Sequence, residues 1–215
     1  MLCLHCHPRF IATVAASLLF AAPPALTEDA DSAHVVEAIW RVQNLLLQYD
    51  SVRTQYACDS LKRKIHAILQ AVGAHESTVV EASCFNHDLL RSASIRITLA
   101  TPVQASEANI LAATTFDGRD RLLARLRKTE LPTAEGIPRF PATWQRVSLS
   151  GRRSLHLDVG DCDLLRGMSQ QIFPQLAIQP LTDRLYCSVS ATRIRPRFEV
   201  QALIALPPSA MARTD

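Results

Sequence analysis

The pattern of apolar and polar positions predicts two similar groups of strands and helices along the chain. In the first group, residues 36–103, residues 38–49 are apolar enough for a strand with one largely buried face, although a helix also fits their local pattern. Residues 52–57 fit a short second strand. Apolar side chains at helical spacing then predict an amphipathic helix, namely Leu61, Ile65, Ile68, Leu69 and Val72. Residues 77–84 and 94–101 alternate as strands do.

The second group, residues 140–208, runs in the same order. Residues 144–149 and 154–159 are typical of strands, and residues 181–187 and 198–206 complete the unit as two more. Between these two pairs lies a helical pattern of apolar side chains, formed by Leu165, Ile172, Phe173 and Leu176. The sequence therefore predicts an α+β protein of two tandem β-β-α-β-β repeats, in which each repeat is a small antiparallel sheet covered by one helix.

Tryptophan and cysteine positions support this internal repeat. Trp40 lies eighteen residues before Cys58, and Trp144 lies eighteen residues before Cys162. Self-similarity at a fixed offset is typical of repeat architectures. We interpret the tryptophans as structural residues that pack under the helices, and the aspartate after each cysteine as a helix N-cap. These two aspartates are Asp59 and Asp163.

Four cysteines beyond the N-terminal segment predict disulfide bonds in an exported chain. Besides Cys58 and Cys162, they include Cys84 and Cys187. Four cysteines permit three pairings, and the matching intervals in the two repeats favour Cys58–Cys84 and Cys162–Cys187. A zinc site built from the four thiolates is the alternative. Such sites usually take ligands from closely spaced pairs, and no close pair follows residue 6.

Residues 104–139 connect the two repeats and have no counterpart after the second one. Asp117 fits the N-cap of a helix over residues 118–128, in which leucines and arginines take different positions on the helical wheel. Prolines and a glycine then predict an extended linker. A short polar tail, residues 209–215, follows the second repeat.

Residues 1–25 have the pattern of a secretory signal peptide. Arg9 precedes an uncharged apolar run at residues 10–22, and prolines and a small residue separate this run from an acidic stretch. The run is short for a membrane span of about 20 residues, so an uncleaved signal anchor is the less favoured alternative. No later stretch has the length and apolar character of a membrane span. We therefore expect an exported protein, in the bacterial periplasm or outside the cell.

Composition limits the class of protein further. Of the 215 residues, 48% are hydrophobic and 20% are charged, which is enough apolar material for a folded core. The net charge of +3 is modest, whereas a dedicated nucleic-acid binder is expected to have a concentrated basic face. Residues 3–7 match the C-x-x-C-H pattern of covalent haem attachment. Because this motif lies within the predicted signal peptide, we expect no haem and no other cofactor.

His156, Asp158 and Asp161 form the densest group of candidate catalytic or metal-binding side chains. An imidazole beside carboxylates suits general acid–base chemistry or a divalent metal, and a strand would place His156 and Asp158 on the same face. The first repeat has no histidine or aspartate at the matching positions, which lie 104 residues earlier, so this group is not part of the shared unit. It supports one alternative function, a small metal-dependent or acid–base hydrolase.

Two arginine clusters are candidate contacts for an anionic partner. One contains Arg121 and Arg125 in the predicted helix of the insert, and the other comprises Arg193, Arg195 and Arg197. Either cluster suits a phospholipid headgroup, a polyanionic glycan or an acidic protein surface. Because no catalytic motif stands out, we expect a non-enzymatic periplasmic or secreted module for binding or envelope assembly. A secreted effector or inhibitor that binds another protein is a further alternative.

Overall fold

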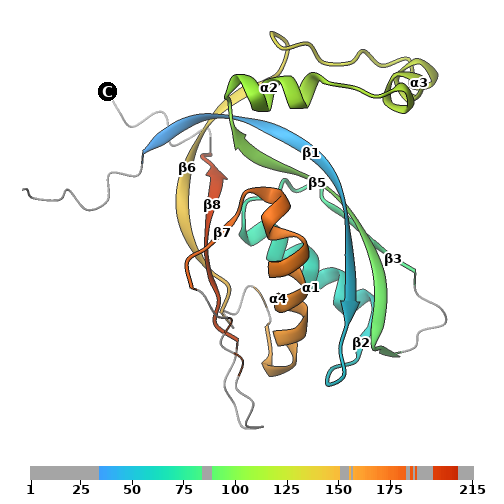
Figure 1. The fold of residues 1–215 in the computed structure, drawn as a ribbon, viewed down its shortest axis with the longest axis vertical. Helices are drawn as coiled ribbons and strands as arrows, with labels where there is room; N and C mark the ends of the chain where they lie inside the picture. The colour runs from blue at the N-terminus through green and yellow to red at the C-terminus, as the bar shows by residue number, and fades with distance from the viewer. Residues whose placement is uncertain are drawn as a thin grey trace, which may run out of the picture. The chain divides into compact units, whose positions relative to one another are not determined.

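The computed structural model shows an α+β fold built around one antiparallel sheet (Figure 1). It describes residues 34–83, 89–150, 155, 157–182, 185, 187 and 196–207. Within these residues, the main sheet has six strands, and four α-helices accompany it. The predicted α+β class is therefore confirmed.

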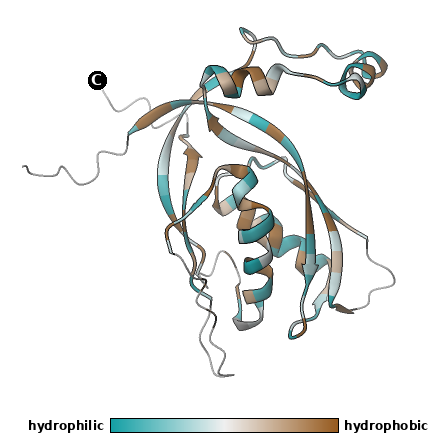
Figure 2. Ribbon diagram, viewed as in Figure 1, coloured by the Kyte–Doolittle hydropathy of each residue, from teal (hydrophilic) through white to brown (hydrophobic). Residues whose placement is uncertain are grey.

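The sheet is built on β1 (Val35–Asp50), the longest of the described strands. Its side chains alternate between the two faces of the sheet, so that Leu45 and Leu47 are buried whereas Leu46 is exposed. Figure 2 shows hydrophobic and hydrophilic segments along β1. Residues 38–49 thus form a strand, and the helix that their local pattern also fits does not occur.

The remaining strands extend the sheet on both sides of β1. On one side, β5 (Ser92–Gln104) pairs with most of β1 and carries β3 (Val79–Ala82) on its other edge. On the other side, β6 (Arg139–Ser148) pairs with the start of β1 and with β8 (Glu199–Ala205), which carries the short β7 (Gln179–Pro180). The strand order is β3-β5-β1-β6-β8-β7.

The helices α1 (Cys58–Ala71) and α4 (Cys162–Gln171) lie on the concave side of this curved sheet (Figure 1). The 3-10 helix η2 (Phe173–Leu176) follows α4. The apolar positions predicted for both helices are confirmed as buried in one core with the inner face of the sheet. The core includes Leu61, Ile65, Ile68, Leu69, Val72, Leu165, Ile172, Phe173 and Leu176. Full burial of one such side chain contributes about 1.5–3 kcal/mol, so this core is the main source of stability.

Between β5 and β6 the insert forms two helices, α2 (Glu107–Thr114) and α3 (Gly118–Arg127). The helix predicted from residue 118 is confirmed. Asp117 is its N-cap as expected, because its carboxylate accepts a hydrogen bond of 2.8 Å from the Asp120 backbone N–H. α2 is an addition to the predicted elements. It contains no buried residue, so it lacks the core-facing stripe that identifies an amphipathic helix.

Two predicted strands of the second repeat are wrong. The described part of residues 154–159 forms no strand, because Asp158 begins the 3-10 helix η1 (Val159–Asp161). The Asp161 carboxylate accepts a hydrogen bond of 2.5 Å from the Asp158 backbone N–H, and this capping interaction turns the chain instead of extending it. The described residues of the strand predicted at 181–187 form no strand either, and the two-residue β7 ends just before this range.

A predicted strand of the first repeat is shorter than expected. Residues 52–57 contribute only β2 (Tyr56–Ala57), which pairs with β4 (Leu89–Leu90) in a separate two-stranded sheet. The Ser51 hydroxyl accepts a hydrogen bond of 2.9 Å from the Thr54 backbone N–H. Local side-chain to backbone bonds of this kind favour turns over strands, so a turn takes up most of the predicted strand.

The predicted N-cap role of Asp59 and Asp163 is wrong. The helices begin at Cys58 and Cys162, and their N-caps lie two positions before the predicted ones, which places each aspartate inside the first turn. Each aspartate forms an ion pair with a basic residue three positions later, at 2.7 Å in both helices. A carboxylate in the first turn also interacts favourably with the helix dipole, so both side chains still support the helix start.

The two tryptophans do not pack under the helices, contrary to expectation. Trp144 joins a second, smaller apolar cluster, apart from the core that contains α1 and α4. Trp40 stacks on Phe140 with ring centroids 4.7 Å apart and meets His75 edge-on at 4.9 Å. Trp40 lies an even number of positions from the exposed Leu46 on β1, so it belongs to the sheet face that is turned away from the helices.

The predicted disulfide Cys162–Cys187 is present. It ties the first residue of α4 to the segment after β7, and its Cα atoms lie 5.8 Å apart. Cys84 lies outside the described residues, so the pairing Cys58–Cys84 stays a prediction.

Candidate functional site

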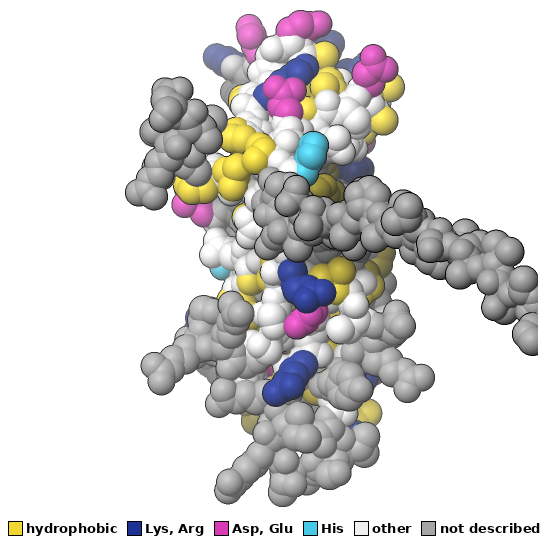
Figure 3. Space-filling view, turned by 90° about the vertical axis from the view of Figure 1, so that its left-hand side faces the viewer, with side chains coloured by type: hydrophobic (Ala, Val, Ile, Leu, Met, Phe, Trp, Pro, Cys, Tyr) yellow, Lys and Arg dark blue, Asp and Glu magenta, His cyan; other side chains and the backbone are white. Residues whose placement is uncertain are grey.

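α1 carries a concentration of basic side chains on the side that it turns away from the core. Leu61 and Ile65 belong to the buried stripe of this helix, so the positions around them point elsewhere on the helical wheel. These positions hold Lys62, Arg63, Lys64 and His66, all of them exposed or half-buried. On the described part of the face shown in Figure 3, by contrast, basic side chains are separated by acidic and uncharged ones.

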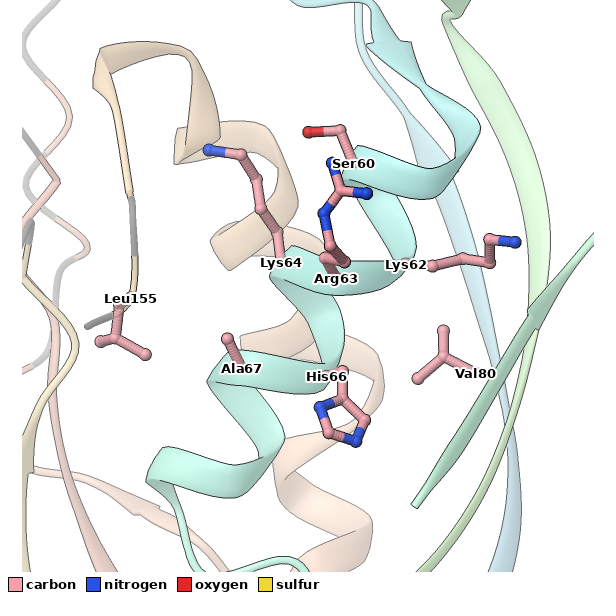
Figure 4. A pocket seen from close by; sticks show the side chains of 8 residues that line it. All are labelled: Ser60, Lys62, Arg63, Lys64, His66, Ala67, Val80 and Leu155. Carbon is pink, nitrogen blue, oxygen red and sulfur yellow. The ribbon is translucent and has the colours of Figure 1, made fainter. Parts of the chain in front are cut away.

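These side chains line a groove of about 660 Å³, which we call the α1 groove. Figure 4 shows Lys62 and Val80 at one side of α1 and Leu155 at the other. The lining residues are Ser60, Lys62, Arg63, Lys64, His66 and Ala67 of α1, together with Val80 of β3 and Leu155. Positive and apolar groups thus lie side by side, and they suit an anion that also carries apolar groups.

The basic side chains of the groove differ in whether they form ion pairs with carboxylates of the protein. The Lys64 side chain is 13% exposed, and its Nζ lies 2.6 Å from the Asp161 carboxylate. Lys62 forms an exposed ion pair with the aspartate of the first helical turn, and such pairs contribute only about 0–1 kcal/mol. Arg63 is exposed and forms no ion pair with any residue that the structure describes. An anion in the groove therefore meets Arg63, His66 and Lys62.

Lys64 belongs instead to a buried polar cluster centred on Asp161, which is 1% exposed. The Asp161 carboxylate accepts hydrogen bonds from the Tyr56 hydroxyl, from the Lys64 ammonium at 2.6 Å and from the Asp158 backbone N–H at 2.5 Å. Burial, followed by the hydrogen bond to Asp161, raises the pKa of Tyr56 above its ordinary value of 10.0. The hydroxyl therefore stays protonated and remains a donor to the carboxylate.

Further hydrogen bonds around this cluster join the loop after β1 to the start of α4. The Ser51 hydroxyl donates to the Asp163 carboxylate over 2.8 Å, and the Thr54 hydroxyl donates to the Gly160 carbonyl over 2.9 Å. The side-chain amide of Gln171 also exchanges two hydrogen bonds with the backbone of β1. These polar groups serve the packing of the two parts of the chain against each other.

The side chains predicted as a catalytic group have separate environments. His156 lies outside the described residues. The Asp158 side chain is 79% exposed, with its carboxylate 3.6 Å from Lys64, whereas Asp161 is buried among donors. Within the described ranges, no group of three or more His, Cys, Asp or Glu side chains is placed to hold a metal ion. The structure thus brings Asp158 and Asp161 together as a helix cap.

The predicted arginine contacts lie on other elements. Arg121 and Arg125 are exposed on α3, and Arg197 is exposed shortly before β8. Arg193 and Arg195 lie outside the described residues. The cavity beside α3, of about 350 Å³, is lined by three basic residues, Arg121, Arg125 and Lys128, and by the acidic Glu130. The α1 groove is larger, at about 660 Å³, and we take it as the main candidate site.

Among the helices that the structure describes, none combines the length and the apolar character needed to cross a membrane. Comparisons of the chain with protein-family models, with curated proteins and with solved structures find no match. The function is therefore inferred from the geometry of the α1 groove and its surroundings.

None of the sites predicted from the sequence corresponds to the α1 groove. Its signal is visible as four basic residues within positions 62–66. A polar helix face of this kind is usually only solvated. The helix face becomes a groove because it lies between Val80 and Leu155. Val80 belongs to the separate strand β3, and Leu155 is distant from α1 in the sequence.

Proposed function

We propose that this protein is a non-enzymatic binding module of the periplasm or extracellular space, and that it holds an anionic ligand in the α1 groove. The observation that carries the proposal is Arg63, which is exposed beside His66 and Lys62 and forms no ion pair within the described part of the chain. Apolar side chains complete the lining. A fitting ligand therefore joins negative groups to apolar ones.

The charges of the groove support a modest affinity that depends on salt. Two unit charges 4 Å apart attract each other by about 1 kcal/mol in bulk water and by about 4 kcal/mol near a protein surface. Exposed pairs realise only about 0.2–1 kcal/mol of this attraction. We therefore expect several such contacts to act together with burial of the apolar lining, and we expect the affinity to fall as salt rises.

The buried polar cluster supports binding over hydrolysis. A general acid or base has to reach the substrate, but the Asp161 carboxylate is buried and faces Tyr56, Lys64 and the backbone of Asp158. Asp158 is exposed, as most surface aspartates are. No contact among the described residues favours the hydrolase that the pattern around His156 suggests.

We also propose that the scaffold consists of two copies of one unit, as the sequence repeat predicts. When β1, β3 and β5 are matched with β6, β7 and β8, the strand order β3-β5-β1-β6-β8-β7 reads the same from both edges. The helices α1 and α4 each begin at a cysteine, at matching places after β1 and β6. By this symmetry, a bond Cys58–Cys84 corresponds to Cys162–Cys187.

Export to an oxidising compartment is part of the same proposal. The disulfide Cys162–Cys187 supports it, because such bonds are common in secreted and periplasmic proteins and rare in the cytosol. The signal-peptide pattern of residues 1–25 supports it independently.

Binding of fluorescently labelled polyglutamate to the purified full chain tests the groove. We expect Arg63→Glu to weaken binding about tenfold, because the change replaces an attraction by a repulsion. Arg125→Glu on α3 is the matched control, since it makes the same change in net charge at another exposed helical arginine. Equal losses of affinity in the two variants would show that polyglutamate binding depends only on the net charge of the protein, and would refute the groove as the site.

A second measurement tests the non-enzymatic part of the proposal. The purified chain is incubated with simple ester, peptide and phosphodiester substrates. We expect no turnover above that of a heat-denatured sample. Turnover that Asp158→Asn abolishes would instead establish the hydrolase.

A further inference from the structure

β3 forms one edge of the six-stranded sheet. It spans Val79–Ala82, pairs with β5 on one side, and has no other described strand on its free side. Backbone N–H and C=O groups on the free side of an edge strand are ready to pair with another extended chain. Within the described part of the chain, the free side of β3 is therefore open to pairing with a further strand.

The same edge borders the α1 groove. Val80 of β3 lines the groove together with Lys62, Arg63 and His66 of α1, and Figure 4 shows Val80 close to Lys62 and His66. The sheet curves around α1 (Figure 1). A strand added beyond β3 at the usual spacing of about 4.8 Å therefore continues this curve across the groove.

We propose that an extended acidic segment of a partner protein binds along β3 as a seventh strand, with every second side chain entering the α1 groove. This inference rests on the proposed function and names the ligand of the same site. In such strand addition, main-chain hydrogen bonds give affinity and alternate side chains give specificity. The side chains that enter the groove face Arg63, His66 and Lys62, so they are Asp or Glu.

The outward side chains of the segment meet different neighbours. Val79 and Glu81 alternate with Val80 and are exposed on the other face of β3. A directly neighbouring acidic side chain is repelled by Glu81, whereas a β-branched side chain packs favourably beside Val79. The segment is therefore expected to alternate acidic residues with β-branched ones.

Charge favours an acidic partner over a second copy of this chain. Pairing of two copies through their β3 edges brings two basic grooves next to each other, and like charges that face each other across strands are destabilising. The acidic stretch of the chain itself fits less well than a partner segment. Glu28 and Asp29 are adjacent in the sequence, so in a strand one of them points outward beside Glu81.

The experiment uses a labelled, acetylated and amidated peptide of sequence Thr-Glu-Val-Glu-Val-Glu-Thr with the purified full chain. Fluorescence anisotropy measures its affinity against the same peptide with Lys in place of Glu. Two further acidic peptides carry N-methyl groups, one on every Glu amide and one on every Val amide. Because neighbouring amides in a strand point to opposite edges, only one of these two peptides loses the hydrogen bonds to β3.

We expect the Glu peptide to bind at least about tenfold more tightly than the Lys peptide, and one N-methylated peptide to bind about tenfold more weakly than the other. Hydrogen exchange of the amides in Val79–Ala82 should slow when the Glu peptide is added. If both N-methylated peptides bind as well as the parent and β3 exchange is unchanged, strand addition is wrong.

The variants of the polyglutamate assay separate this failure from a failure of the groove. The Glu peptide could bind without strand pairing and lose affinity in Arg63→Glu but not in Arg125→Glu. That result would support the groove as an anion site and overturn strand addition alone. If the Glu peptide binds Arg63→Glu and Arg125→Glu with equal affinity, the groove is overturned as the binding site as well. A triple variant Glu28→Gln, Asp29→Asn, Asp31→Asn should keep the peptide affinity unchanged. An increase of about tenfold would identify this stretch as the occupant and overturn the partner segment.

Discussion

Replacement of Asp161 by Asn tests whether the buried polar cluster holds the two parts of the chain together. The change keeps the size of the side chain but removes its charge. With its oxygen still directed to Lys64 and to the Asp158 backbone N–H, the new amide N–H₂ faces the Tyr56 hydroxyl, which then has to accept a hydrogen bond instead of donating one. The Lys64 ammonium loses its buried counter-charge, and this loss is the main cost.

The magnitude follows from the environment of Lys64. Removal of one partner of a buried ion pair typically costs about 3–5 kcal/mol. The Lys64 side chain keeps 13% exposure and lies 3.6 Å from the Asp158 carboxylate, so part of its charge stays compensated. We therefore expect the lower end of the range, about 3 kcal/mol. With an m-value of about 2 kcal/mol/M, this lowers the midpoint of urea unfolding by about 1.5 M.

Urea unfolding at neutral pH, followed by far-ultraviolet circular dichroism, measures this loss. Asp158→Asn is the matched control, because it makes the same chemical change on an exposed side chain whose capping role Asn retains, and we expect it to cost less than about 0.5 kcal/mol. Combining Asp161→Asn with Lys64→Met should recover part of the loss, since no buried charge then lacks a partner. Midpoints of Asp161→Asn and Asp158→Asn that agree within error would refute the role of the ion pair.

Other contacts make independent predictions. Gly73→Ala should destabilise the fold by about 1–3 kcal/mol in the same urea assay. Gly73 has a φ of 93°, and a Cβ there would lie 2.7 Å from a backbone oxygen of β8. Gly118→Ala is the control and should be neutral, because a Cβ there would have nothing within 4 Å. The pKa of Tyr56 is raised above 10.0 in the folded chain, so its contribution to stability is complete below about pH 10 and is lost as pH rises further. Tyr56→Phe should flatten this alkaline loss in a pH series of urea midpoints, and an unchanged slope would contradict it. Peptide mapping without reduction should find Cys58 linked to Cys84, and free thiols at both would remove the second predicted disulfide.

α1 and β1 show how much of the fold follows from local pattern. The buried stripe of α1 is predicted residue by residue, because the period of an amphipathic helix depends only on neighbouring positions. For residues 38–49 the local pattern also fits a helix, and the pairing of β1 with β5 and β6 makes this segment a strand. The N-cap of α1 lies at Ala57, two residues before the predicted cap, and local signals commonly leave an error of this size. Trp40 is placed on the wrong face because a repeated position says nothing about which face of a strand it occupies.

The role of Asp161 shows what local pattern cannot predict. Its spacing from Asp158 suits a capping box, and this local signal was available. Its burial and its charge partner depend on Tyr56 and Lys64, which are 105 and 97 positions away in the chain. Without those contacts, a cluster of aspartates beside a histidine resembles a catalytic group. The α1 groove escapes prediction for the same reason, since Val80 and Leu155 form its sides.

Adjacent residues of α1 have different roles, and this separates stability from binding. Successive residues of a helix are rotated by about 100°, so Lys64 turns to the buried Asp161 while Arg63 is exposed in the groove. Lys64→Met should therefore lower the urea midpoint and change the peptide affinity of the folded chain much less than Arg63→Glu does. Arg63→Glu should do the reverse. If both variants changed both properties in parallel, groove and cluster would be one unit, and loss of binding in Arg63→Glu would reflect a damaged fold.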